Sequence, residues 1–165
     1  MKRLLLATVA TLALVVAPGP ALARTAGDQG FLIISAGPLD AVRTVIAFGT
    51  IDGVGAEVVV SSSPGAVNVR WDFPQGTLFV TSTFTTVMEL DPVTCLRTVT
   101  LTGTWRITGA TDELAGTTGG GTFSGPNSTI LSRGPDDRCV NPPVLRPLLL
   151  FEYEGSVGLA NRAAA

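Results

Sequence analysis

The amino-acid sequence predicts an all-β protein, built either as a closed antiparallel barrel or as a β-sandwich. Segments in which apolar and polar residues alternate recur along the chain, as expected for strands with one buried face. Gly, Pro, Asp and Ser separate these segments at hairpin-length intervals. Helical periodicity is nearly absent beyond the N-terminus, so no βαβ pattern supports a parallel sheet. Consecutive antiparallel strands in this number form a barrel or a sandwich.

Residues 1–23 are predicted to be a secretory signal peptide. Lys2 and Arg3 precede an uncharged apolar run, helix-breaking prolines and an Ala-Leu-Ala cleavage site. The apolar run is shorter than the roughly 20 residues that span a bilayer, which disfavours a membrane anchor. We therefore expect an extracellular, secreted protein with a single β-barrel domain over 24–165, ordered from about 30 to 160.

The composition of the mature chain excludes several functions. Removing Lys2 and Arg3 leaves nine arginines, no lysine and thirteen acidic residues, a net charge of −4. An acidic chain without basic clusters is not expected to bind nucleic acid. The sequence has no histidine, the commonest general base and a common metal ligand. We therefore expect no catalytic residue, metal site or cofactor, and we favour a protein that is not an enzyme. Abundant Ala, Gly and Arg without lysine is typical of a GC-rich bacterial genome.

Four strands are predicted before residue 91. Residues 42–51 alternate with period two and end at an Asp-Gly turn. Residues 56–63 are rich in valine and end at Pro-Gly. Residues 66–73 alternate most clearly, and residues 77–90 follow a Pro-Gln-Gly turn as one long or bent strand.

Three further strands are predicted after an Asp-Pro turn. Residues 95–109 form the longest alternating run, in which Gly103 indicates a bend or a bulge. A strand returns at about residue 117 and continues to 133, and a proline-rich loop follows it. The last predicted strand is 148–160.

Glycine is concentrated between the fifth and sixth of these strands, in TWRITGATDELAGTTGGGTFSG, residues 104–125. A phosphate-binding loop would need a lysine or a following helix, and neither is present. We expect instead a corner in which the strand ends at Thr108, Gly109 takes a positive φ, residues 112–115 form one turn closed by Gly116, and glycines allow close backbone approach.

This stretch resembles the signature of the allene oxide cyclase and dirigent barrels and their small secreted bacterial relatives. Ala110 and Asp112 stand where that family usually has glycine. The matching positions are Ile107, Thr108, Gly109, Thr111, Leu114, Gly116 and Gly119. The resemblance implies an eight-stranded antiparallel barrel with an apolar lumen, which is either filled by side chains or holds one small ligand. It implies no catalytic residue at any of these positions.

The interior aromatic residues Trp71, Trp105 and Tyr153 are the candidates for ligand binding. They either fill the core or line a pocket for an apolar molecule. The only two cysteines, Cys95 and Cys139, are expected to form a disulfide in an oxidising compartment.

Three functions remain open from the sequence. The protein binds a small hydrophobic molecule in its lumen, or steers a reactive intermediate as a cyclase-like or dirigent-like protein, or has a structural or surface-interaction role. We favour the first function, because no polar constellation is visible. No membrane span is expected in the mature chain, and a homo-oligomer is compatible with the sequence.

The remaining carboxylate pairs are interpreted as solvent-facing. Glu152 and Glu154 alternate with the apolar face of Phe151 and Tyr153, so we expect them on the outer surface. Asp136-Asp137 lies in the proline-rich loop.

Overall fold

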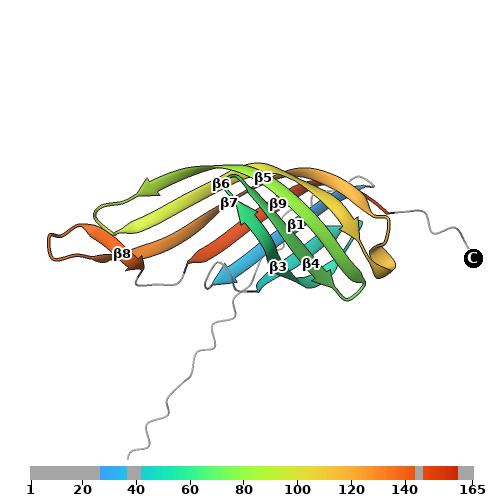
Figure 1. Ribbon diagram of the computed structural model, residues 1–165, viewed down its shortest axis with the longest axis horizontal. Helices are drawn as coiled ribbons and strands as arrows, with labels where there is room; N and C mark the ends of the chain where they lie inside the picture. Colours follow the sequence, from blue (N-terminus) through green and yellow to red (C-terminus); the bar gives the residue numbers. More distant parts are fainter. Residues whose placement is uncertain (1–26, 37–41, 144–146, 160–165) are drawn as a thin grey trace, which may run out of the picture.

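The computed structural model describes residues 27–36, 42–143 and 147–159, and these residues are almost entirely β-strand (Figure 1). The predicted signal peptide lies outside the described residues. The elements of the described part are β1 (Asp28–Ala36), β2 (Arg43–Gly49), β3 (Gly53–Ser63), β4 (Ala66–Phe73), β5 (Gly76–Leu90), β6 (Leu96–Ala110), the 3-10 turn η1 (Asp112–Leu114), β7 (Thr118–Arg133), β8 (Cys139–Pro143) and β9 (Leu148–Gly158).

The strands form a closed barrel. They pair in the order β6-β5-β4-β3-β2-β1-β9-β7, and β6 also pairs with β7, which closes the ring. All of these pairs are antiparallel. β8 adds a short ninth strand beside the end of β7. The eight-stranded antiparallel barrel is therefore confirmed, and the sandwich alternative is wrong.

Three strands are much longer than their neighbours. β5, β6 and β7 have 15, 15 and 16 residues, whereas β4 has 8. Pairing between β4 and β5 stops at Ala66–Thr83, and pairing between β7 and β9 stops at Ser128–Leu148. Beyond these points the long strands continue as a curved ribbon that projects past one end of the barrel (Figure 1). We call this ribbon, residues 85–100 and 129–143, the overhang.

A disulfide ties the far end of the overhang together. Cys95, just before β6, bonds to Cys139 at the start of β8, with the two Cα atoms 5.3 Å apart. The Arg133 side chain donates hydrogen bonds to the carbonyl oxygens of Pro92 and Val93 on the neighbouring turn. The predicted disulfide is confirmed. It closes a loop of about 45 residues, worth roughly 4 kcal/mol in the chain-entropy account.

The core is made by inward-facing side chains from every barrel strand, as period-two alternation requires. One buried side chain from each of seven strands illustrates this, each at most 4% exposed: Phe31, Val45, Trp71, Leu78, Trp105, Phe123 and Tyr153. β3 contributes Glu57, which is 2% exposed. The faces predicted to be buried in 66–73 and 148–160 are the inward faces.

Glycines occupy inward positions where strands bend around the barrel. At Gly103 an added Cβ would meet the backbone carbonyl oxygen of Thr83 and would lie 2.8 Å from the Cα of Phe84. Gly121 and Gly155 have the same close approach to backbone across β7 and β9. The β5–β6 register is unbroken at Gly103, so the predicted irregularity there is a bend and not a bulge.

The corner after β6 follows the prediction in outline. η1 forms the expected turn, and Gly116 closes it with φ +79°. The expectation for Gly109 is wrong: β6 continues to Ala110, and Gly109 lies inside the ladder opposite Phe79 without a positive φ. The left-handed position before the turn belongs to Asp112, with φ +54°.

Two strands lie where alternation gives no signal. β1 contains an unbroken apolar run, Phe31-Leu32-Ile33-Ile34, of which Phe31 and Ile33 face inward. β8 lies in the segment expected to be only a loop, where Cys139 and Val140 pair with the end of β7. Because this segment is rich in proline, its sequence does not indicate a strand. Proline is nevertheless compatible with β8, because a strand at the edge of a sheet needs few backbone N–H donors.

The substitution Gly103→Ala is expected to lower the free energy of unfolding by roughly 1–3 kcal/mol, because the new methyl group can be accommodated only by moving backbone. Gly109→Ala is the matched control on the same strand, since its Cβ would lie 3.4 Å from the Phe79 ring. It should change the unfolding free energy by less than about 0.5 kcal/mol. Urea denaturation measures both variants, and equal losses at the two positions would contradict the close approach at Gly103.

Candidate ligand-binding cavity in the lumen

The lumen is filled at one end and hollow at the end beneath the overhang. The hollow part is a cavity of about 440 Å³ with mostly apolar walls. Its lining residues are Arg43, Glu57, Val59, Ser62, Val67, Val69, Phe84, Thr86, Arg97, Val99, Leu101, Phe123, Asn127, Leu149, Phe151 and Tyr153. Three of these residues, Thr86, Arg97 and Val99, belong to the overhang, and the others belong to the barrel. The surplus length of the long strands therefore builds one wall of the cavity.

An aromatic cluster fills the closed part of the lumen. The rings of Phe31 and Trp71 have centroids 4.5 Å apart, and Trp105 meets Phe31 edge-on at 5.5 Å. Tyr153 meets Trp71 edge-on at 5.3 Å and stacks on Phe123 at 4.7 Å. Such contacts stabilise packed rings by more than their buried area alone, so the aromatic cluster forms a closely packed inner boundary of the cavity.

The three predicted ligand-binding residues fall on the two sides of this boundary. Tyr153 lines the cavity. Trp71 and Trp105 are fully buried behind it and contact the Tyr153 ring. The Trp105 indole also donates to the backbone oxygen of Glu154 at 3.1 Å. Of the three, only Tyr153 is placed to touch an occupant of the cavity.

A buried ion pair borders the cavity near Tyr153. The Arg43 guanidinium donates to one Glu57 oxygen at 2.7 Å, and the Trp71 indole N–H donates to the other at 2.8 Å. The two charges arise from adjacent strands, because Arg43 and Glu57 are direct partners in the β2–β3 ladder. A buried carboxylate is tolerable only with such partners, so the ion pair contributes no net charge to the cavity.

Arg97 brings a second guanidinium to the cavity. It faces inward on β6, on the same side as Val99 and Leu101, and it lines the wall. Its Nε is buried, and among the described residues no hydrogen bond or salt bridge engages the side chain. Since Arg43 is neutralised by Glu57, the cavity carries the positive charge of Arg97. Alternation in the sequence places Arg97 on the inward face. The residue type alone, however, does not predict that an arginine lies in an apolar lumen.

Tyr153 is held in its neutral form. Burial raises the pKa of its hydroxyl well above the usual value, and the nearby Glu57 carboxylate raises the pKa further. Ser82 and the charge of Arg43 oppose the shift only in part. The hydroxyl can therefore exchange hydrogen bonds with an occupant without ionising.

Several other polar side chains lie outside the lumen. Glu152 and Glu154 are exposed on the outer face of β9, as predicted. Arg70 and Asp72 form an outward salt bridge of 2.9 Å on β4. Asp136-Asp137 lies in the exposed turn before β8.

Comparisons with known proteins returned no match among protein-family models, curated proteins or solved structures. In the part of the chain that the structure describes, no helix has the length and apolarity needed to cross a membrane.

Tyr153 is the only tyrosine of the sequence, so tyrosinate absorbance reports on it alone. In the folded protein we expect no tyrosinate signal at pH ~10, where a tyrosine of an unfolded chain is half ionised. The folded pKa is raised, so the resulting stabilisation is complete below the unfolded value. It is lost as the pH rises above about 10. Tyr153→Phe should remove this alkaline loss of unfolding free energy. Half-ionisation near pH 10 with the fold intact would contradict the assignment.

Proposed function

We propose that the protein binds a small apolar molecule with one anionic group inside its lumen. The observation that carries this proposal is Arg97, a guanidinium without a partner among the described residues, in the wall of an apolar cavity. A volume of about 440 Å³ is in the range of small-molecule sites. The ligand's apolar body would contact the aliphatic and aromatic walls, and its anionic group would face Arg97.

The charge arrangement gives the site its selectivity. A partly buried cation without a partner loses hydration that the protein does not replace. A carboxylate, sulfonate or phosphate oxygen restores both hydrogen bonds and charge balance, and guanidinium–anion hydrogen bonds are among the stronger ones in proteins. A neutral ligand of the same shape gains only the apolar contribution, roughly 25 cal/mol per Å² of buried surface.

We place this binding function outside the cytoplasm. The signal-peptide pattern of residues 1–23 supports secretion. The Cys95–Cys139 disulfide is consistent with an oxidising compartment.

The resemblance to allene oxide cyclase and dirigent barrels supports a second role, the steering of a reactive intermediate. That role depends on an enclosing shape more than on acid–base groups, and the cavity provides such a shape. Glu57 is the only carboxylate among the lining residues. Both of its oxygens are already hydrogen-bonded, to Arg43 and Trp71, which favours binding over proton transfer.

Two fluorescent probes of similar shape test the binding proposal: the anion anilinonaphthalene sulfonate and the uncharged N-phenylnaphthylamine. Arg97→Gln should weaken binding of the anion by roughly tenfold to a hundredfold, the value of a charged hydrogen bond. Binding of the uncharged probe should stay within about twofold, because the apolar walls are intact. Arg106→Gln, an exposed position on the same strand, is the matched control and should change neither affinity.

Three results would overturn the proposal. They are no binding of either probe to the wild-type protein, equal losses for both probes in Arg97→Gln, or equal effects of the two arginine variants. Retained binding of the uncharged probe by Arg97→Gln shows that the variant is folded.

A further inference from the structure

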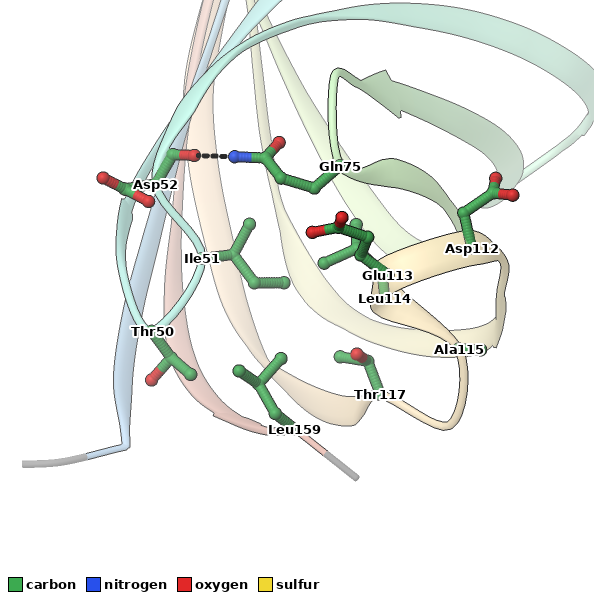
Figure 2. A pocket seen from close by; sticks show the side chains of 10 residues that line it. All are labelled: Thr50, Ile51, Asp52, Gln75, Asp112, Glu113, Leu114, Ala115, Thr117 and Leu159. Carbon is green, nitrogen blue, oxygen red and sulfur yellow. Dashed lines mark hydrogen bonds between the residues drawn. The ribbon is translucent and has the colours of Figure 1, made fainter. Parts of the chain in front are cut away.

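The two ends of the barrel differ in how their strands finish. At the end away from the overhang, the β2–β3 turn, the β4–β5 turn and η1 surround a pocket of about 640 Å³ (Figure 2). The Gln75 side chain donates to the Asp52 carbonyl oxygen at 3.1 Å, which links the two turns (Figure 2). The strands there turn directly into their neighbours, whereas the strands of the overhang leave theirs.

The overhang has two side edges of different composition. Its strands lie in the order β5-β6-β7-β8, so β5 forms one edge and β8 the other (Figure 1). A sheet edge offers unpaired backbone groups to any strand that comes alongside, and proline or lysine commonly protects such edges. β8 contains two prolines, Pro142 and Pro143. The β5 edge, residues 85–90, contains neither proline nor lysine.

Alternate residues of β5 direct their backbone groups to this edge. The Phe84 N–H donates toward β4, to the Gly65 carbonyl oxygen at 2.8 Å. Beyond Phe84, β5 pairs with β6 alone in the described part of the chain. Because every second residue of a strand directs its N–H and C=O to the same side, Thr86, Met88 and Leu90 present these groups away from β6.

The side chains of this edge are mostly apolar and exposed to solvent. Val87, Met88 and Leu90 are 62%, 68% and 46% exposed. Glu89 is the only charged residue of 85–90. Free backbone groups next to exposed apolar side chains are typical of a strand that pairs with another chain.

The edge is complementary to a second copy of itself in one register. The free run extends from residue 85 to residue 91, where the chain turns back toward β6, and Met88 is its midpoint. In an antiparallel pairing about a two-fold axis at Met88, the two Met88 residues lie opposite each other. Thr86 of each copy then lies opposite Leu90 of the other. Each opposed pair exchanges two N–H···O hydrogen bonds.

The neighbouring residues favour this register over the two closest alternatives. It places Glu89 of each copy opposite Val87 of the other. Sliding the pairing outward by two residues would put the two Glu89 side chains opposite each other, which is unfavourable, and would bring Pro92, which lacks an N–H, opposite Thr86. Sliding it inward would require the Phe84 N–H, which already donates to Gly65.

We propose that two copies of this protein associate through the β5 edge, residues 85–91, as an antiparallel pair centred on Met88. Both copies use the same surface, so the association closes at the dimer. The inference does not depend on ligand binding in the lumen, because Val87, Met88, Glu89 and Leu90 are not lining residues of the cavity.

Sedimentation equilibrium of the mature protein over a wide concentration range measures the association. A monomer–dimer equilibrium is expected. Met88→Lys should weaken dimerisation roughly fivefold to tenfold, because the two lysines would lie opposite each other across the axis. Val54→Lys is the matched control, since Val54 is an apolar side chain of β3 with a similar exposure of 59%. It should leave the dimerisation constant unchanged.

Substitutions at Val87 test the register through opposite effects. Val87→Arg would face Glu89 of the second copy and should strengthen dimerisation about two- to fivefold. Val87→Glu would place like charges opposite each other and should weaken dimerisation by a similar factor. Equal urea midpoints of the two variants, measured at low protein concentration, show that both are folded.

Cysteine cross-linking locates the axis. Opposed residues of a hydrogen-bonded pair have Cα atoms about 5.5 Å apart, which suits a disulfide. Met88→Cys should therefore form a covalent dimer under mild oxidation. Leu90→Cys on the same face is the matched control, because the two substituted positions would lie about 13 Å apart along the paired strands.

Four results would overturn the proposal. The protein remains a monomer at every concentration, or its association continues beyond the dimer. Val54→Lys weakens association as much as Met88→Lys does, or the two cysteine variants cross-link equally.

Discussion

The sheet closes where β6 pairs with β7, over eleven residue pairs from Leu96–Ile130 to Arg106–Gly120. Closure requires strands to coil tightly, and coiled strands bring backbone against backbone at the bends. Gly103, Gly121 and Gly155 stand at inward positions where an added Cβ would collide with a neighbouring strand. The absence of side chains there lets the ring close. The closed ring gives the lumen a fixed diameter. The side chains at the other inward positions then determine how much of the lumen is filled.

The unequal lengths of the strands decide where the lumen is filled. Aromatic rings from short and long strands alike meet in the closed half. Beyond the end of β4 the strands β5, β6 and β7 continue, and the cavity beneath them is lined by these three strands together with β2, β3, β4 and β9. The disulfide joins the two turns at the end of this ribbon. Without such a link, three strands that leave the barrel would depend on their own ladder hydrogen bonds to keep the wall of the cavity in place.

Much of this architecture follows from sequence pattern. Period-two alternation in 66–73 and 148–160 assigns the inward faces correctly, and the same rule puts Glu152 and Glu154 outside. Because the sequence has only two cysteines, it also predicts the Cys95–Cys139 disulfide. β1 has apolar residues on both faces, so alternation cannot identify it. The predicted positive φ at Gly109 assumes that the strand ends at Thr108, whereas the ladder with Phe79 extends the strand past it.

The sequence predicts the candidate site less well than it predicts the fold. The interior aromatic residues are the ligand-binding candidates that the sequence offers. A ring large enough to bind a ligand is also large enough to fill a core. The neighbouring rings determine which of the two roles an aromatic side chain has. Trp71 and Trp105 are enclosed by Phe31 and Tyr153, and only Tyr153 borders open space. The cavity is lined by residues from seven strands, so it is a property of several strands together and of no single segment.

The two arginines of the cavity differ in what surrounds them, and the difference carries the functional argument. Arg43 lies opposite Glu57 in the ladder, so its charge is balanced inside the protein. Arg97 lies opposite Thr129 and Leu90 in the adjoining strands, neither of which offers a carboxylate. Each charge of the Arg43–Glu57 pair has its partner inside the protein. The pair therefore needs no ligand to explain it. A lone guanidinium beside Val99 and Leu101 gains nothing for the fold from its charge. This difference between Arg43 and Arg97 is the basis of the proposed anion-binding site.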